Sequence, residues 1–228
     1  MKLNSDKTEI LVFNTHNDLE NISFQVKHED QMISLLPKKH IEILGILIDQ
    51  DLNWTKQVNR VKRNSMNATR NIHRINHLLT RDHRINMYNG VIKPNFDFGD
   101  ILWGGCLEKD SQSLQRIQNF AVKSITGNKY DSASQSFNEL KFLNLHQRRK
   151  VHETVFLHKA LLNKSSKNLH EEYTSYLPPI STRRAEHKKL LVPSHNSAKF
   201  ERSPLYRTIH TWNETPNSLP KDTLKSLI

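Results

Sequence analysis

The 228-residue sequence contains a single cysteine, Cys106, and no long apolar run. One cysteine cannot build an internal disulfide framework, and it excludes zinc sites made from paired cysteines. A membrane-spanning helix needs about 18 to 20 consecutive apolar residues, which the sequence lacks, and the first 30 residues carry acids where a signal peptide has its apolar core. These absences predict a protein of a reducing compartment, the nucleus or the cytoplasm, with no membrane partner.

Acidic side chains are outnumbered, and one segment almost lacks them. The chain has 34 Lys and Arg against 23 Asp and Glu, a net charge of +11, and such an excess favours a polyanionic partner. An anionic membrane surface is the alternative. Residues 1–53 hold 5 basic and 9 acidic side chains, a net charge of −4, whereas residues 54–93 hold 9 basic and 1 acidic, a net charge of +8. The chain therefore changes character at Trp54.

The segment before Trp54 is predicted to form a small antiparallel sheet. Three runs rich in β-forming residues, 8–13, 23–27 and 41–49, are separated by polar turn residues. Gly45, inside the third run, indicates a bulge, a close approach of another backbone, or simple packing.

Residues 55–79 are predicted to form one long helix with two different sides. Apolar and small residues recur every three or four positions and form one stripe. The stripe consists of Val58, Val61, Ser65, Ala68, Ile72, Ile75 and Leu79. Basic residues fall within about 40° of a common line on the opposite side. They are Lys56, Arg63, Arg70, Arg74, His77 and Arg81.

This basic line predicts contact with nucleic acid. No acid occurs between Trp54 and Arg81, whereas solvated helix faces ordinarily mix both signs. A straight row of positive charge can follow a phosphate backbone, and ordinary solvation is the alternative.

The rest of the chain is predicted to be mostly helical. Thr80 suits the N-cap of a short helix, Gly127 suits the end of another, and Asn144 with Gln147 has the spacing of a capping box. Beyond residue 164 the periodicity fades into a basic segment rich in proline and serine. The prediction is an α+β chain in three parts: a small antiparallel sheet at 1–53, a mainly α-helical bundle at 54–164, and a basic, partly irregular region at 165–228.

Several segments carry a family resemblance through their order and spacing. They are "LNSDKTEILVF", "IEILGILIDQDLNW", "MYNGVIKPNFDFGDILWGG", "LQRIQNFAVKSITG", "LKFLNLHQRRK" and "WNETPNSLP". Together they resemble the end of the palm and the thumb of LINE-type (non-LTR retrotransposon, jockey-like) reverse transcriptases, over nearly the whole chain.

The resemblance implies roles for particular residues. Lys7 would match the palm lysine that assists the departure of pyrophosphate, whereas its immediate neighbourhood, beside Asp6, favours an ordinary surface lysine. Leu44, Gly45 and Ile46 would form the primer grip in a hairpin. The helix after Trp54 would be the first thumb helix, lying along the template–primer duplex, with a palm-to-thumb joint at Trp54.

The resemblance places the reaction centre of such polymerases upstream of Met1. Nucleotidyl transfer uses two divalent ions held by carboxylates, and this chain has no adjacent pair of aspartates. Asp49 and Asp51 are typical of a turn rather than a metal site. We therefore expect no metal, no cofactor and no catalysis from this chain by itself, with Mg²⁺ acting only in a complete polymerase.

Three functions stay open at this point. The first is a polymerase fragment that binds RNA–DNA or DNA duplexes without sequence preference. The second is a chain that works in a polymerase when an upstream segment associates with it and supplies the palm carboxylates. The third is an inactive relic or a protein-interaction module.

Overall fold

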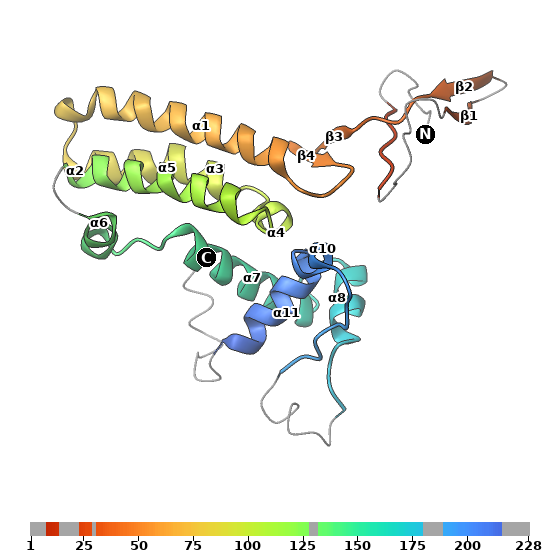
Figure 1. Ribbon diagram of the computed structural model, residues 1–228. Helices are drawn as coiled ribbons and strands as arrows, with labels where there is room; N and C mark the ends of the chain where they lie inside the picture. Colours follow the sequence, from red (N-terminus) through yellow and green to blue (C-terminus); the bar gives the residue numbers. More distant parts are fainter. Residues whose placement is uncertain (1–7, 14–22, 29–30, 128–131, 180–188, 216–228) are drawn as a thin grey trace.

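The computed structural model describes residues 8–13, 23–28, 31–127, 132–179 and 189–215. Two small antiparallel hairpins precede a mainly helical body, so the predicted α+β class is confirmed (Figure 1). Each hairpin is a two-stranded unit of its own. The strands are β1 (Phe24–His28) with β2 (Gln31–Leu35), and β3 (His40–Ile43) with β4 (Ile46–Asp49).

The predicted strand at residues 8–13 is wrong. That segment makes one isolated parallel bridge, between Ile10 and Pro37, and no ladder. The second strand of the first hairpin, β2, was not predicted, because Met32 and Ser34 are exposed and Ile33 and Leu35 are no more than half-buried. Figure 1 shows the β1–β2 hairpin standing away from the helical body.

The run at residues 41–49 folds back on itself instead of forming one strand. Leu44 and Gly45 make the turn between β3 and β4 with φ values of 48° and 82°. Two successive residues with positive φ match the right-handed twist of a two-residue hairpin, and glycine adopts this conformation without a Cβ penalty. Gly45 is therefore a turn residue rather than a bulge.

The joint between β4 and the first helix is organised by the carboxylate of Asp49. Its Oδ1 accepts hydrogen bonds from the backbone N–H groups of Asp51 (3.1 Å) and Asn53 (3.0 Å), and its Oδ2 accepts one from Trp54 (2.8 Å). Trp54 is buried and has φ 63°. The acidic residues before the helix thus form a turn, because the Asp49 carboxylate is occupied by backbone donors.

The helical body is layered. Figure 1 shows α1 lying along α5 and α3, with α7 on the other side of that layer and α8, α10 and α11 beyond α7. The elements are α1 (Thr55–Arg74), the 3₁₀ turn η3 (Asn76–Leu78), α2 (Arg81–Met87), the π-helical turn η4 (Tyr88–Ile92), α3 (Lys93–Asp97), α4 (Asp100–Trp103), α5 (Glu108–Thr126), α6 (Ala133–Leu140), α7 (Leu145–Leu161), α8 (Lys167–Thr174), α10 (Ala198–Glu201) and α11 (Pro204–Glu214).

The long helix ends earlier than the predicted residue 79. α1 stops at Arg74, and the chain turns through η3. Asn76 fixes this turn, because its Nδ2 donates to the carbonyl of Ser124 (2.7 Å) while its own carbonyl accepts from Arg84 (2.9 Å). Tertiary hydrogen bonds therefore override a periodicity that would have carried the helix further.

Two separate apolar cores hold the body together, and α7 contributes to both. The first core includes Trp103 and Leu114, each fully buried, and Leu145 from the start of α7. The second core forms around Leu157 and Ala160 from the end of α7. It is completed by Tyr173, Leu190 and Ile209.

The region after residue 164 combines helices with irregular segments. α8, α10 and α11 are helical, whereas the described residues 175–179 and 189–197 form no helix or strand. α11 packs against α7, where Arg207 Nη2 lies 3.1 Å from Glu153 Oε1 in a largely buried ion pair. The short lengths of these helices and the prolines between them explain why their periodicity is weak in the sequence.

Candidate nucleic-acid interface

One side of α1 is buried against the rest of the body. The buried residues are Gln57, Val58, Val61, Ser65, Thr69 and Ile72. Most belong to the predicted apolar stripe, whereas Gln57 and Thr69 have polar side chains that find partners there. Gln57 Oε1 accepts from the backbone of Leu47 (3.0 Å), and Thr69 Oγ1 donates to the carbonyl of Ser65 (2.7 Å). Burial of this side fixes which side of α1 faces solvent.

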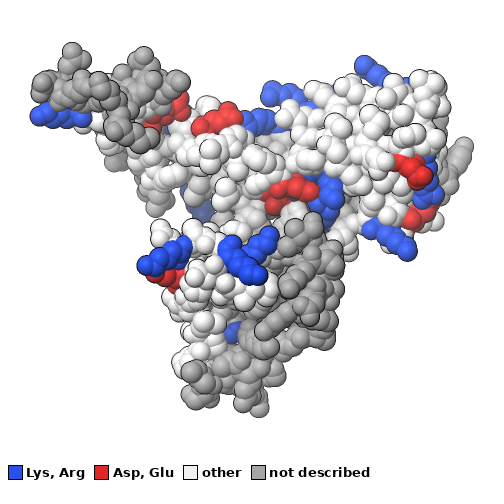
Figure 2. All heavy atoms as spheres, turned by 180° about the vertical axis from the view of Figure 1, so that it is seen from behind, with Lys and Arg blue, Asp and Glu red and all other residues white. Residues whose placement is uncertain are grey.

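The opposite side of α1 carries exposed basic residues. Lys56, Arg63, Arg70 and Arg74 are all exposed, and at about 1.5 Å per residue they span about 27 Å. Within the described chain, Arg63, Arg70 and Arg74 form no ion pair. We call these three residues the arginine ridge. Figure 2, which views the molecule from behind, shows basic side chains along its upper edge, where α1 lies.

Exposed asparagines lie among the arginines on the same helix, and sequence reasoning did not include them. They are Asn59, Asn64, Asn67 and Asn71. Amide groups donate hydrogen bonds to phosphate oxygens, as arginines do, but without charge. The exposed side of α1 is thus rich in donors and contains no acid. A helical-wheel count of uncharged donors would have found them.

Three of the six predicted basic residues do not belong to the arginine ridge, because they have a partner or lie outside α1. Lys56 Nζ lies 2.7 Å from Nδ1 of His40, and Arg81 Nη2 lies 2.7 Å from Oε1 of Glu139. His77 is exposed but sits in η3, and Arg81 begins α2. The predicted single line of six residues is therefore not continuous on one helix.

Arg60 lies between the ridge and the β3–β4 hairpin, to which it is bonded. Its Nη1 donates to Glu42 Oε1 (2.8 Å), and its Nη2 donates to the carbonyl of Gly45 and to Gln57 Oε1 (2.9 Å). This side chain joins the turn of the hairpin to α1, and it forms an ion pair with Glu42.

The predicted primer-grip residues have three different environments. Leu44 is 91% exposed at the tip of the hairpin, whereas Ile46 is buried in the first core. Gly45 lies against the ring of Phe98. The hairpin therefore presents Leu44, together with the 48% exposed Ile43, to solvent and is anchored by Ile46. Lys7 lies outside the described residues.

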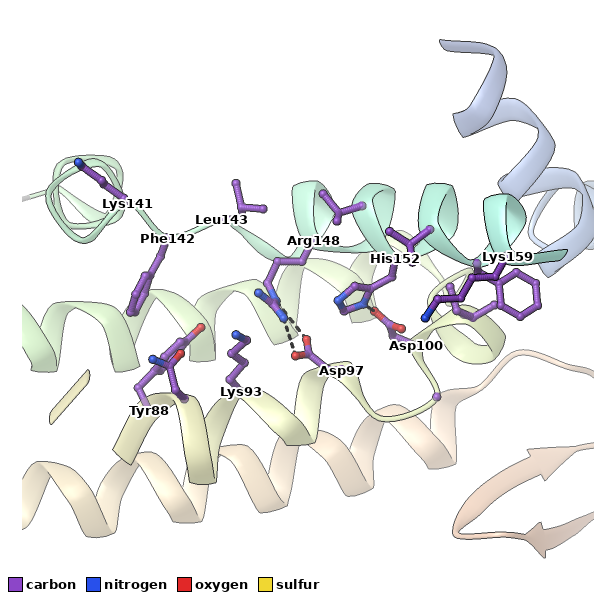
Figure 3. A pocket seen from close by; sticks show the side chains of 16 residues that line it. Tyr88, Lys93, Asp97, Asp100, Lys141, Phe142, Leu143, Arg148, His152 and Lys159 are labelled. Carbon is purple, nitrogen blue, oxygen red and sulfur yellow. Dashed lines mark hydrogen bonds and ion pairs between the residues drawn. The ribbon is translucent and has the colours of Figure 1, made fainter. Parts of the chain in front are cut away.

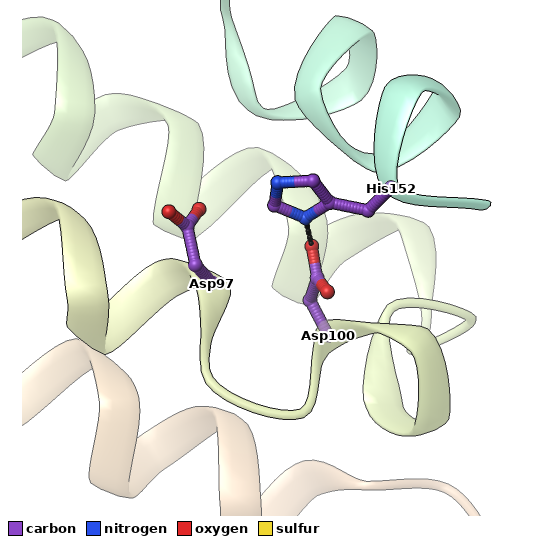
Figure 4. A group of neighbouring side chains, drawn as sticks. All are labelled: Asp97, Asp100 and His152. Atoms are coloured by element: carbon purple, nitrogen blue, oxygen red, sulfur yellow. Dashed lines mark hydrogen bonds and ion pairs between the residues drawn. The ribbon is translucent and has the colours of Figure 1, made fainter. Parts of the chain in front are cut away.

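A second group of polar residues, which the sequence did not indicate, lies between α3, α4 and α7. Asp97, Asp100 and His152 each place one ligand atom within 4.8 Å of the others (Figure 4). Two carboxylates and an imidazole are ligands that a divalent ion accepts. Here they already have partners, since Arg148 donates to both oxygens of Asp97 (3.1 and 2.5 Å) and His152 Nδ1 lies 2.6 Å from Asp100 Oδ2.

The environment of His152 favours its protonated form. The hydrogen bond to Asp100 raises the pKa of His152, and this effect outweighs partial burial, which acts in the opposite direction. The guanidinium of Arg148 neutralises Asp97, and His152 neutralises Asp100 when its imidazole is protonated. The arrangement supports ion pairing between helices rather than a metal centre.

The same residues border a cleft of about 710 Å³ (Figure 3). One side of the cleft is formed by η4, α3 and α4, and the opposite side is formed by α7 and the segment before it. Tyr88 lies at one end, where its ring stacks on Phe142 with centroids 5.0 Å apart. Gln118 Nε2 donates to the Tyr88 hydroxyl (2.9 Å), so this end is fixed by a buried hydrogen bond.

The surroundings of Cys106 do not activate its thiol as a nucleophile. The thiol is buried, and burial raises the pKa of Cys106, which disfavours the reactive thiolate. A packing role follows.

Comparisons with protein-family models, with curated proteins and with solved structures gave no match. Among the described residues, no helix combines the length and the apolarity that crossing a membrane requires.

Proposed function

We propose that this chain is a fragment of a LINE-type reverse transcriptase, and that it binds nucleic-acid duplexes without sequence preference through α1. The proposal concerns binding and not catalysis. The observation that carries it is the arginine ridge: Arg63, Arg70 and Arg74 are exposed opposite the buried side of α1, and no acid of the described chain pairs with them.

The dimensions and the chemistry of α1 suit a phosphate backbone. The exposed basic residues span about 27 Å, and a duplex carries about one charge per 1.7 Å of its axis, so about 16 phosphates pass along that length. Arginine and asparagine donors contact phosphates without reading bases. The absence of an acid from α1 removes the like-charge repulsion that a mixed surface would create.

Reversal of charge on the arginine ridge tests the proposal. The triple variant R63E/R70E/R74E should bind a labelled RNA–DNA or DNA duplex at least about tenfold more weakly at low salt. Its plot of log K against log salt should flatten by about 2.7, because each lost phosphate contact removes about 0.9 of slope. Fluorescence anisotropy from 50 to 200 mM salt measures both quantities.

A charge-matched variant is the control. Lys109, Arg116 and Lys164 are exposed and form no ion pair within the described chain. The variant K109E/R116E/K164E changes the net charge equally and should retain most of the affinity. Circular dichroism of both variants verifies folding. A ridge variant that binds like the parent, with an unchanged salt slope, would show that α1 is not the interface.

The N-terminal hairpins favour association with a separate polymerase segment, which is a second candidate role. Met32, Leu36 and Leu44 are 60%, 64% and 91% exposed. Within the described residues each of these strands pairs with one partner strand only. Exposed apolar side chains beside such strands are typical of surfaces that another element covers. An open reading frame before Met1 that encodes a Tyr/Phe-x-Asp-Asp hairpin would support this role, and stop codons there would count against it.

A further inference from the structure

The cleft between α3, α4 and α7 has a net positive lining. Lys93, Lys141 and Lys159 line it and form no ion pair among the described residues. They come from α3, from the end of α6 and from α7, which are far apart in the sequence (Figure 3). In Figure 3 Lys93 and Lys159 point toward the cleft, whereas Lys141 lies at its rim with its ammonium group directed outward. A cleft lined by cations from three separate elements indicates an anionic ligand.

The acids of the cleft do not oppose such a ligand. Asp97 is bonded by Arg148, and Asp100 is bonded by His152. Arg148 neutralises Asp97, and the Asp100 carboxylate already has a hydrogen-bond partner in His152, so the lysines dominate the charge that an incoming ligand meets. The pairs also join α7 to α3 and α4.

The α7 wall of the cleft carries both charged and apolar side chains along one stripe. The stripe consists of Arg148, Val151, His152, Val155, Phe156 and Lys159. These positions step by three, one, three, one and three residues and therefore share one face of the helix, over about 16 Å at about 1.5 Å per residue. The opposite end of the cleft adds Phe142 and Leu143.

We propose that this cleft binds a single strand of nucleic acid. Sites for single strands combine a positive groove that follows the backbone with apolar and aromatic surfaces against which bases pack. A duplex presents its phosphates on the outside and keeps its bases inside, so it suits the convex arginine ridge and not this cleft. The inference rests on the proposed function in one respect: both surfaces take nucleic acid from the same template–primer.

The test uses the full chain and two separate probes. One probe is a labelled 12-nucleotide oligothymidine, and the other is a blunt duplex of the same length. The variant K93Q/K141Q/K159Q should bind oligothymidine at least about tenfold more weakly than the parent, with a salt slope smaller by about 2, because each single-strand phosphate contact contributes about 0.7. Its affinity for the blunt duplex should change less than twofold.

Two controls separate this inference from the duplex proposal. The variant K109Q/R116Q/K164Q carries the same charge change elsewhere and should bind oligothymidine like the parent. The ridge variant R63E/R70E/R74E should lose duplex affinity and retain most of its single-strand affinity. Failure of duplex binding alone would overturn the proposed function and leave the cleft assignment standing.

Three results would overturn the cleft assignment. The first is a parent chain that does not bind oligothymidine. The second is a cleft variant that binds oligothymidine like the parent, or whose affinities for the duplex and for the single strand fall by the same factor. The third is displacement of oligothymidine by thymidine monophosphate at an equal concentration, which would identify the cleft as a site for a small phosphate ligand.

Discussion

His152 Nδ1 and Asp100 Oδ2 lie 2.6 Å apart, and this contact joins α7 to the start of α4. Asp100 is 5% exposed and therefore needs a partner for its charge. Asp97 and Arg148 face the same imidazole from α3 and α7. The contact links one wall of the cleft to the other.

The stabilisation from this pair should decrease as the pH rises. The folded chain raises the pKa of His152 through Asp100, so the stabilisation is complete below the unfolded value of about 6.5 and is lost as the pH passes through the higher folded value. We expect the difference in free energy of unfolding between the parent and H152Q to be on the order of 1 kcal/mol at pH 5.5 and much smaller at pH 8.5.

Urea unfolding at several pH values between 5.5 and 8.5 measures this difference. H77Q is the matched control, because His77 is exposed and has no carboxylate partner within the described chain. The difference in free energy of unfolding between the parent and H77Q should change little between pH 5.5 and 8.5. A parent-to-H152Q difference that is constant or grows with pH would contradict the assigned role of the imidazole.

Gly99 should tolerate no side chain, because it holds the second hairpin against the helical body. It has φ 66°, and an added Cβ would lie 2.4 Å from Ile46 Cδ1. G99A should lower the free energy of unfolding by about 2 kcal/mol or more, since the left-handed conformation alone costs about 1 to 2 kcal/mol for a residue with a Cβ.

Gly90 provides the comparison within the same chain. It lies in the helical turn η4, and an added Cβ would meet nothing within 4 Å. G90A should therefore stabilise the chain by about 0.5 to 1 kcal/mol. Thermal and urea unfolding of both variants would show opposite signs; a destabilising G90A together with a neutral G99A would refute this account of the two positions.

Loss of Arg207 should weaken the attachment of α11. Arg207 Nη2 lies 3.1 Å from Glu153 Oε1 and donates to the carbonyl of Ile101 (2.7 Å), while Thr211 Oγ1 donates to the other oxygen of Glu153 (2.6 Å). R207M leaves a carboxylate that is 8% exposed without its cation and should cost about 3 to 5 kcal/mol.

A double-mutant cycle isolates this pair. E153Q removes the charge that R207M would strand, so E153Q/R207M should be more stable than R207M alone. Limited proteolysis should cut R207M faster near α11 than it cuts the double variant. Strict additivity of the two single changes would mean that the two groups do not interact energetically.

The sequence predicted the long, strongly periodic elements and missed what tertiary contacts decide. The stripe from Val58 to Ile72 identifies α1 because its period is local, and the spacing of Asn144 and Gln147 identifies the capping box that begins α7. The end of α1 depends on Asn76 and Ser124, which lie 48 residues apart. No local pattern reports such a bond.

The candidate sites divide in the same way. The arginine ridge was visible in the sequence because one helix carries it. The cleft was not, because Lys93, Lys141 and Lys159 belong to separate elements and have unremarkable neighbours in the sequence. Asp97 and Asp100 also escaped notice, since their partners Arg148 and His152 lie about fifty residues away.

α7 begins with Leu145 in one apolar core and ends with Leu157 and Ala160 in the other. A single 17-residue rod therefore couples two hydrophobic clusters that otherwise grow from different parts of the chain. Thermal unfolding of either cluster removes the packing of one end of α7. Because α7 forms one wall of the cleft, unfolding of the C-terminal helices should also change the cleft.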